Sequence, residues 1–229
     1  MNFSHVTLET CHKASGVVVV IDVVRAFTTA AVAFSRGAES ILLVSEVTEA
    51  LALRQRFPFA RLMGEVNGLP IPVFEYGNSP SALAAEDLSG CLLIQRTSAG
   101  TQGMVRSRAA HVLLAGSFSC ALATVDYIRR SAADSVTFVV TGKRPGDSGD
   151  EDAACAEYLE RLLVDGSADP APYLRRVFAA DTVRKFLDEN EPDFPRQDLD
   201  YCTAANRFDF AMLASRQDGL LRLKPVWVC

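Results

Sequence analysis

Short apolar runs alternate along the chain with segments of helical spacing. Val17–Ile21 is β-branched and apolar at every position, which is typical of a strand buried on both faces of a parallel sheet. Apolar residues recur at helical spacing over Ala26–Arg36, and Gly37 follows at a position suited to ending a helix. Thr48 predicts the N-cap of a second helix that runs through Arg56.

The alternation continues through most of the chain. Further strands are expected at Ile41–Val44, Arg61–Gly64, Leu92–Gln95, Val112–Ala115, Ser135–Thr141 and, closing the chain, Leu220–Val228. Glu151–Leu163 has the spacing of an amphipathic helix, and Asp165–Asp200 predicts helices joined by prolines. This pattern predicts an α/β fold with a largely parallel sheet flanked by helices. We expect a single domain over residues 1–229, and the pattern leaves open whether it consists of two packed lobes.

Composition and charge narrow the class of protein. The chain has 23 basic and 28 acidic side chains, a balance that disfavours nucleic-acid binding. The longest apolar run, Gly16–Ile21, is far shorter than the roughly 20 residues that cross a bilayer. No basic stretch followed by a long apolar stretch begins at Met1, and the six cysteines include no C-x-x-C pair. We expect a cytoplasmic protein with free thiols and no membrane partner, and the sequence leaves open a homo-oligomer.

Candidate chemistry lies directly after the predicted strands, because ligands of open α/β sheets bind outside the carboxyl ends of the strands. Asp22 ends the first strand, and Arg25 and Thr28 follow it. A carboxylate there can hold a metal, while an arginine and a hydroxyl can face an anion. Capping of the next helix by Asp22 and a surface ion pair of Arg25 explain the same residues equally well.

A long loop, Gly64–Pro80, contains Glu65, Asn78 and Ser79. Such a loop is uncommon in a compact chain unless it is functional, and a surface Ω-loop is the alternative. The next glycine-containing turn offers backbone N–H groups, hydroxyls and a cation to a phosphate through Arg96, Ser98, Gly100 and Thr101. No G-K-[ST] follows, so ATP is not implied.

Acidic residues gather around a second glycine-rich segment, Gly142–Gly149. Asp147, Asp150, Glu151 and Asp152 are more acids than a helix N-terminus needs, and they suit a hard cation such as Mg²⁺. Acids and phosphate-suited turns at successive strand ends together predict a Mg²⁺-dependent phosphoryl site.

Other classes of protein explain fewer of these residues. An isochorismatase-like cysteine hydrolase would use Asp22 and Cys120, but it also needs a lysine between them, and none is present. Cys120 is more simply a packing residue. A haloacid-dehalogenase-type phosphatase needs an aspartate where the chain has Val24. A non-enzymatic anion-binding protein leaves the acidic clusters without a role.

Several blocks of the chain resemble the 2-phosphosulfolactate phosphatase (ComB) family, in the family's order. They are DVVRAFTTA, GEVNGLPIPVFEYGNSP, RTSAGTQG, AGSFSCALAT and GKRPGDSGDEDAACA, and Asp198–Cys202 resembles a later stretch. The resemblance implies an α/β fold of the family's own and a Mg²⁺-dependent phosphatase that releases sulfolactate and phosphate, a step in coenzyme M synthesis. The chain departs from the family's Thr-Asn-Gly-Thr at Ser98–Thr101, where Ala99 replaces the asparagine.

These observations predict a phosphatase that acts on a small anionic phosphate ester. Asp22, Glu65 and Asp152 are the first candidates for metal ligands, with Glu151 and Asp147 next, and Glu65 or Asp150–Asp152 supplies the general base. The catalytic candidates are Asp22, Glu65, Asp152 and Glu151. The candidates for substrate binding are Arg25, Thr28, Asn78, Ser79, Arg96, Ser98, Gly100, Thr101 and Lys143.

Overall fold

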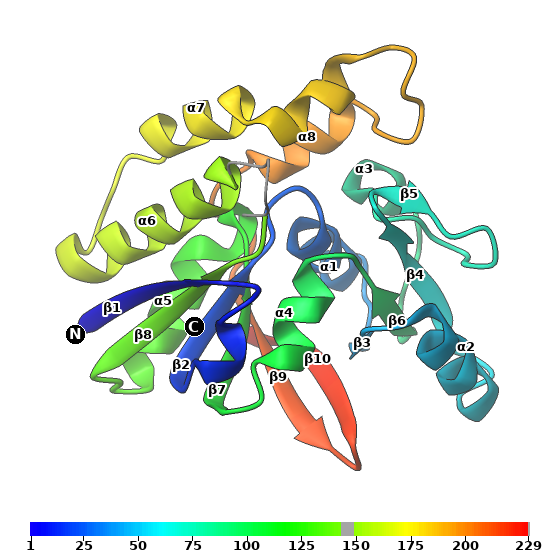
Figure 1. The fold of residues 1–229 in the computed structure, drawn as a ribbon, viewed down its shortest axis with the longest axis horizontal. Helices are drawn as coiled ribbons and strands as arrows, with labels where there is room; N and C mark the ends of the chain where they lie inside the picture. The colour runs from blue at the N-terminus through cyan, green and yellow to red at the C-terminus, as the bar shows by residue number, and fades with distance from the viewer. Residues whose placement is uncertain (143–148, 229) are drawn as a thin grey trace.

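The fold is a mixed α/β arrangement around one strongly twisted sheet (Figure 1). The computed structural model describes residues 1–142 and 149–228. Within them, ten strands form a sheet in the order β1-β8-β2-β7-β9-β10-β3-β6-β4-β5. The strands are β1 (Asn2–Thr7), β2 (Gly16–Ile21), β3 (Ser40–Val44), β4 (Arg61–Val66), β5 (Leu69–Pro70), β6 (Leu92–Arg96), β7 (Ala110–Gly116), β8 (Ser135–Val140), β9 (Phe210–Gln217) and β10 (Leu220–Trp227).

Two parallel groups of strands make up most of the sheet. β1, β8, β2 and β7 form one group, and β3, β6 and β4 form the other. The β9–β10 hairpin joins them, and it pairs antiparallel with β7 on one side and with β3 on the other. The expected α/β fold with a largely parallel sheet is therefore confirmed, with an antiparallel insertion at its centre.

Helices follow most strands, as the alternating pattern predicts. The α-helices are α1 (Ala26–Ser35), α2 (Val47–Arg56), α3 (Pro80–Leu83), α4 (Gly100–Arg106), α5 (Ala121–Arg130), α6 (Asp150–Asp165), α7 (Ala171–Ala179) and α8 (Gln197–Cys202). The 3₁₀ helices are η1 (Cys11–Lys13), η2 (Phe118–Cys120) and η3 (Asp181–Leu187). In the described part of the chain, no helix has the length and apolar character needed to cross a membrane.

Strand alternation divides the core into layers. In β2, Val18 and Val20 belong to the same buried cluster as α1, whereas Val17 and Val19 pack with α5 and α6 on the opposite face. The second parallel group behaves likewise: alternate residues of β3 face α1 and α2. The sheet therefore folds around α1 and α4, with α5 and α6 outside one half and α2 outside the other.

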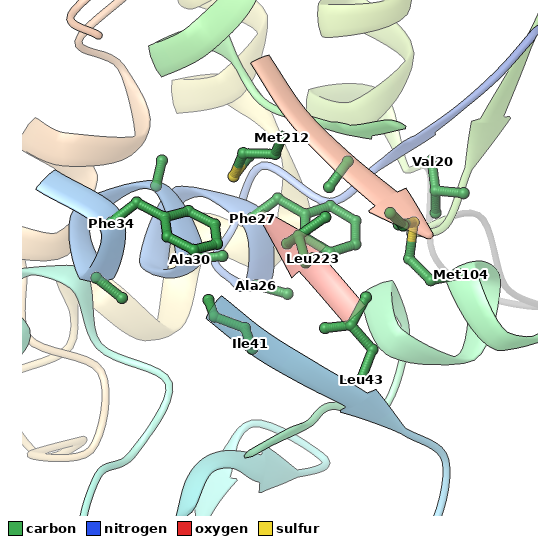
Figure 2. Close-up of a cluster of buried hydrophobic side chains, with 14 of the residues drawn as sticks. Val20, Ala26, Phe27, Ala30, Phe34, Ile41, Leu43, Met104, Met212 and Leu223 are labelled. Carbon is green, nitrogen blue, oxygen red and sulfur yellow. The ribbon is translucent and has the colours of Figure 1, made fainter. Parts of the chain in front are cut away.

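The helix α1 is enclosed on every side. Its first nine residues, Ala26 to Phe34, are all buried. Figure 2 shows Phe27 and Phe34 of this helix between Met212 on one side and Ile41 on the other. A helix buried all round is apolar all round, and only Thr28 and Thr29 interrupt the apolar sequence of this segment.

The twist of the sheet brings the carboxyl ends of the two parallel groups together. Three antiparallel pairings separate β2 from β4, so in a flat sheet the two strands would run in opposite directions. Adjacent strands rotate by about 20–25°, which accumulates to roughly 120–150° over the six pairings from β2 to β4. The rotation turns the second group toward the direction of the first, and residues that follow β2, β6 and β8 line one cavity.

The structure corrects three details of the expected elements. The N-cap of α2 is Glu46 and not Thr48, and the Glu49 carboxylate accepts a hydrogen bond from the Ser45 N–H just before the helix. The strands β1 and β9 were not predicted: polar residues interrupt the pattern of β1, and the apolar start of β9, at 210–214, was not assigned to a strand. The closing strand β10 lies inside the sheet, and its pairing partners could not be inferred from its own sequence.

The enclosure of α1 predicts a large difference between two phenylalanine truncations. Phe27 is fully buried, and Phe27→Ala should lower the free energy of unfolding by about 3–5 kcal/mol because it leaves a cavity. Phe59 is 96% exposed, and the control Phe59→Ala should change it by less than about 0.5 kcal/mol. Denaturant titration measures both values, and equal effects would contradict the enclosure.

Candidate functional site

A cavity of about 500 Å³ opens at the joined carboxyl ends of the strands. Strand ends and the start of α6 form one part of its wall, and η3 with the segment before α8 forms another. Its charged lining residues within the described chain are Asp22, Arg25, Glu65, Glu151, Asp152, Asp181 and Lys185. Its main uncharged polar residues are Asn67, Asn78, Ser98, Thr141 and Thr182.

Two aspartates are fixed in this cavity by backbone N–H groups. Asp22 follows β2, and its Oδ1 accepts a hydrogen bond from Ala26 N at 3.0 Å, which supports the start of α1. Asp152 lies in the first turn of α6, and its Oδ1 accepts from Val23 N at 2.8 Å while its Oδ2 accepts from Gly142 N at 2.8 Å. The loops after β2 and β8 and the start of α6 thus meet at Asp152.

The acidic side chains repel one another electrostatically. Burial is the main cause that raises the pKa of the Asp152 carboxyl well above its usual range, and the charges of Glu151 and Asp22 raise it further. Buried carboxylates of like charge are stabilised by a cation, so this donor set fits a hard divalent ion. Within residues 1–142 and 149–228, no three acidic, histidine or cysteine side chains converge as a complete ligand set. Mg²⁺ commonly uses only one or two carboxylates and keeps waters.

Glu65 has a different set of partners. Its carboxylate accepts hydrogen bonds from Gly68 N, Ser98 N and the Ser98 hydroxyl. It therefore joins the end of β4 to the turn after β6, and this turn also lines the cavity. Both of its oxygens accept hydrogen bonds, as those of Asp152 do, and these contacts position the two loops. The role of Glu65 as a metal ligand stays a prediction.

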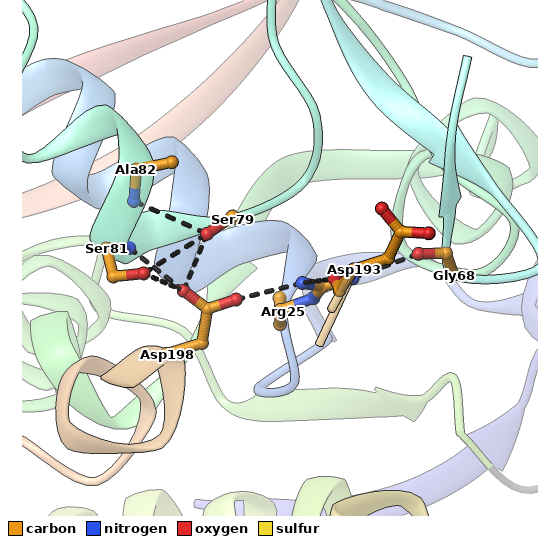
Figure 3. A network of polar contacts seen from close by, with 7 residues as sticks. All are labelled: Arg25, Gly68, Ser79, Ser81, Ala82, Asp193 and Asp198. Atoms are coloured by element: carbon orange, nitrogen blue, oxygen red, sulfur yellow. Dashed lines mark hydrogen bonds and ion pairs between the residues drawn. The ribbon is translucent and has the colours of Figure 1, made fainter. Parts of the chain in front are cut away.

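The Arg25 guanidinium is the centre of a buried polar network (Figure 3). Its Nη1 donates to Asp198 Oδ2 at 2.8 Å and to the carbonyl oxygen of Asp193, and its Nη2 donates to the carbonyl oxygen of Gly68. Arg25 is 4% exposed and Asp198 is fully buried. Asp198 Oδ1 in turn accepts from the hydroxyl of Ser79 at 2.7 Å and from the backbone N–H and hydroxyl of Ser81.

Other candidates from the sequence lie outside the cavity wall. Thr28 donates to the Val23 carbonyl oxygen, and Thr101 exchanges hydrogen bonds with Thr97. Arg96 donates to the carbonyl oxygens of Ser45 and Glu65 and to the Ser98 hydroxyl. These side chains donate hydrogen bonds to acceptors within the protein, and their part in substrate binding stays a prediction.

Gly100, another candidate, bears on how the loops pack. A Cβ atom at Gly100 would lie 2.9 Å from Asp22 Oδ2, so only glycine lets α4 begin this close to the aspartate. Lys143 and Asp147 lie outside the described residues. Ala99 lines the cavity, which places the departure from the family's asparagine at the wall of the candidate site.

Asn78 carries an unusual side-chain environment in the same wall. It is 6% exposed, and its Oδ1 has no hydrogen-bond partner within the described residues. An unpaired buried amide oxygen costs folding free energy, which is common where a group serves a ligand. This environment suits the predicted role of Asn78 in substrate binding.

The sequence did not point to the residues that η3 and the segment after it contribute. Thr182 donates a hydrogen bond to Glu151 Oε1 at 3.0 Å, and Asp181, Lys185, Phe186 and Phe194 line the cavity beside it. These residues follow no strand, so the strand-end rule could not find them. The only available signal was the pair of phenylalanines beside a lysine, and such pairs are common in cores.

Cys120 does not have the surroundings of a nucleophile. The thiol is fully buried and is not among the residues of the cavity wall, and burial raises its pKa to about 12. The reactive species of a cysteine is its thiolate. These facts favour packing for Cys120 over the cysteine-hydrolase alternative.

Comparisons with known proteins agree on one family. The family model described as 2-phosphosulpholactate phosphatase matches residues 4–217. A probable 2-phosphosulfolactate phosphatase of Bacillus subtilis is 36% identical over 203 residues, which cover 88% of this chain and 87% of that protein. A probable 2-phosphosulfolactate phosphatase of Carboxydothermus hydrogenoformans is 32% identical over 215 residues, 89% of this chain and 88% of that protein.

The buried state of Cys120 predicts selective alkylation. With a pKa of about 12, roughly one thiol in ten thousand is ionised at pH 8, so iodoacetamide should leave Cys120 unmodified in the folded protein. Partly exposed Cys91 is the internal control and should react, and both should react in denaturant. Peptide mass spectrometry reads out each site, and labelling of native Cys120 as fast as Cys91 would contradict its burial.

Proposed function

The chain belongs to the 2-phosphosulpholactate phosphatase family, and from this membership we propose that it hydrolyses 2-phosphosulfolactate to sulfolactate and phosphate with Mg²⁺ as cofactor. The observation that carries the proposal is the group of three carboxyl residues, Asp22, Glu151 and Asp152, in the wall of the cavity. A dianionic phosphoryl group would be repelled from this wall without a cation. These acidic side chains would repel a phosphate ester on its own, but they would hold a metal ion that in turn binds the phosphate ester.

Asp22 and Asp152 are the proposed metal-holding residues. Each is anchored by backbone N–H groups, which fixes its carboxylate relative to the ends of β2 and β8. Mg²⁺ bound there supplies charge that neutralises the phosphoryl oxygens.

Glu151 is the proposed general base. The hydrogen bond from Thr182 holds its Oε1, and the carboxylate lies in the cavity beside Asp152. In the reaction a water oxygen bonds to phosphorus as one of its protons passes to the carboxylate, and the ester P–O bond breaks. The leaving alkoxide takes a proton from solvent water, so the products are sulfolactate and inorganic phosphate. Glu65 acts indirectly in this proposal, because it holds the turn at Ser98 against the cavity.

Removal of charge at Asp22 tests the proposed metal site. Asp22→Asn keeps the size of the side chain and an oxygen acceptor for Ala26 N, so the fold should persist. Phosphate release from 2-phosphosulfolactate should fall by about 10²- to 10³-fold, because charge stabilisation of the transition state is lost. The control Asp134→Asn, at an exposed position outside the cavity, should retain full activity.

The same assay contains the metal test. Excess chelator should abolish phosphate release by the wild-type protein, and added Mg²⁺ should restore it. Full activity in chelator would overturn the metal proposal, and full activity of Asp22→Asn at saturating Mg²⁺ would overturn the assignment of Asp22.

Asn78→Ala should lower the activity without lowering the thermal stability. The unpaired buried amide oxygen costs folding free energy, so its removal should leave Tm unchanged or raise it. kcat/KM should fall at least about tenfold if the amide contacts the substrate. Asn190→Ala, at an exposed loop position, is the matched control and should change neither kcat/KM nor the affinity for substrate. A lower Tm with intact kcat/KM would assign Asn78 to the fold instead.

A further inference from the structure

The charges that line the cavity are unevenly distributed. Five acidic side chains line it within the described residues, against two cations, Arg25 and Lys185. Arg25 is ion-paired with buried Asp198, and it also donates to two carbonyl oxygens. Lys185 makes no ion pair with any described residue, and its side chain is exposed at the cavity. Of the two, Lys185 is therefore the cation that can meet an anionic ligand.

The helix η3 orients Lys185 toward the cavity. Residues three apart on a 3₁₀ helix lie on the same face, which places Lys185 in line with Thr182. The Thr182 hydroxyl touches Glu151 at the carboxylate end of the cavity. Lys185 lies one helical turn further along, about 6 Å at the rise of a 3₁₀ helix. A substrate whose phosphoryl group lies near Thr182 could therefore place a second group of the same molecule near Lys185.

An aromatic platform supports the ammonium group. Lys185 Nζ lies 5.1 Å from the centroid of the Phe194 ring, within the range of a cation–π contact. Phe194 meets Phe186 edge to face at 5.4 Å, and the Arg25 guanidinium lies 5.1 Å and 5.0 Å from the two ring centroids. A buried cation and its hydrogen bonds therefore fix the rings.

The platform also has a fixed place relative to the long loop. Gly68 has a φ of +86°, and a Cβ there would lie 2.8 Å from the Phe194 ring, so the loop and the ring are in close contact. Gly68 also donates its N–H to Glu65 and accepts from Arg25 through its carbonyl oxygen. Lys185 therefore lies over a ring that Gly68 and Arg25 contact closely.

We propose that Lys185 determines substrate specificity by binding a second anionic group of the substrate, a carboxylate or a sulfonate, while the phosphoryl group lies at Asp22, Glu151 and Asp152. The inference rests on the proposed function and adds to it the residue that selects a phosphate ester with an anionic tail. Arg25 is a positioning residue in this arrangement, since it acts on the substrate through Phe186 and Phe194.

The test compares two phosphate esters of secondary alcohols. 2-Phosphosulfolactate carries a carboxylate and a sulfonate, and propan-2-yl phosphate carries neither. Lys185→Gln should lower kcat/KM for 2-phosphosulfolactate by about 10- to 100-fold, the value of a lost charged hydrogen bond, and leave kcat/KM for propan-2-yl phosphate unchanged. Lys185→Arg should recover most of the loss. The control Lys224→Gln, at an exposed position on β10, should behave as wild type on both esters.

Equal losses on both esters would overturn the proposal, because Lys185 would then serve the phosphoryl group or the fold. No loss on either would overturn it as well.

A binding measurement separates this inference from the proposed function. Sulfolactate has the two anionic groups but no phosphoryl group, and calorimetric titration should show that it binds the wild-type protein and Lys224→Gln about 10- to 100-fold more tightly than Lys185→Gln. If the wild-type protein does not hydrolyse 2-phosphosulfolactate, the proposed function fails and this titration alone decides the role of Lys185. Equal affinities, or no binding to the wild-type protein, would overturn the inference.

Discussion

The structure depends on the complete burial of α1. A helix whose first nine residues are buried needs apolar partners all round, and here the two halves of one sheet supply them. The β9–β10 hairpin is what lets one sheet do this, because it joins two parallel groups and adds enough twist to turn one toward the other. The convergence of Asp22 after β2 with Ser98 after β6 is a consequence of that hydrophobic enclosure.

A second constraint is the buried pair of Arg25 and Asp198. Desolvation of two charges is costly, and such a pair persists when further hydrogen bonds compensate both partners. Here three carbonyl or carboxylate oxygens accept from Arg25, and two serines donate to Asp198. The pair ties together four segments that are distant in sequence: the loop after β2, the turn between β4 and β5, the start of α3 and the start of α8. The arginine lines the cavity while these oxygens hold its guanidinium, and its part in binding an anionic substrate stays a prediction.

The strands and the acidic residues of the cavity could be predicted from the sequence, but the partners of Arg25 and Lys185 could not. Val17–Ile21 is apolar at every position because both of its faces are buried, and this property is visible without a structure. The rule that ligands lie after parallel strands then located Asp22 and Asp152. Arg25 also follows a strand, and nothing local to it reveals that Asp198 lies beside it. Lys185 was missed since its position depends on packing between η3 and Phe194, which no periodic pattern records.

The distribution of charge in the cavity follows from these placements. Arg25 and Arg96 donate to oxygens of the protein itself, and among the described residues of the wall the acidic side chains outnumber the cations. An anionic substrate can enter such a cavity only if cations supplement the protein's own side chains, or if its charged groups reach the few cations that remain. In the proposed reaction a metal ion at the carboxylates would meet the first need, and Lys185 would meet the second. On this proposal, an ester with an uncharged tail would need only the metal, and the proposed selectivity for esters with an anionic tail would arise from the way the fold pairs Arg25 and Arg96 with its own oxygens.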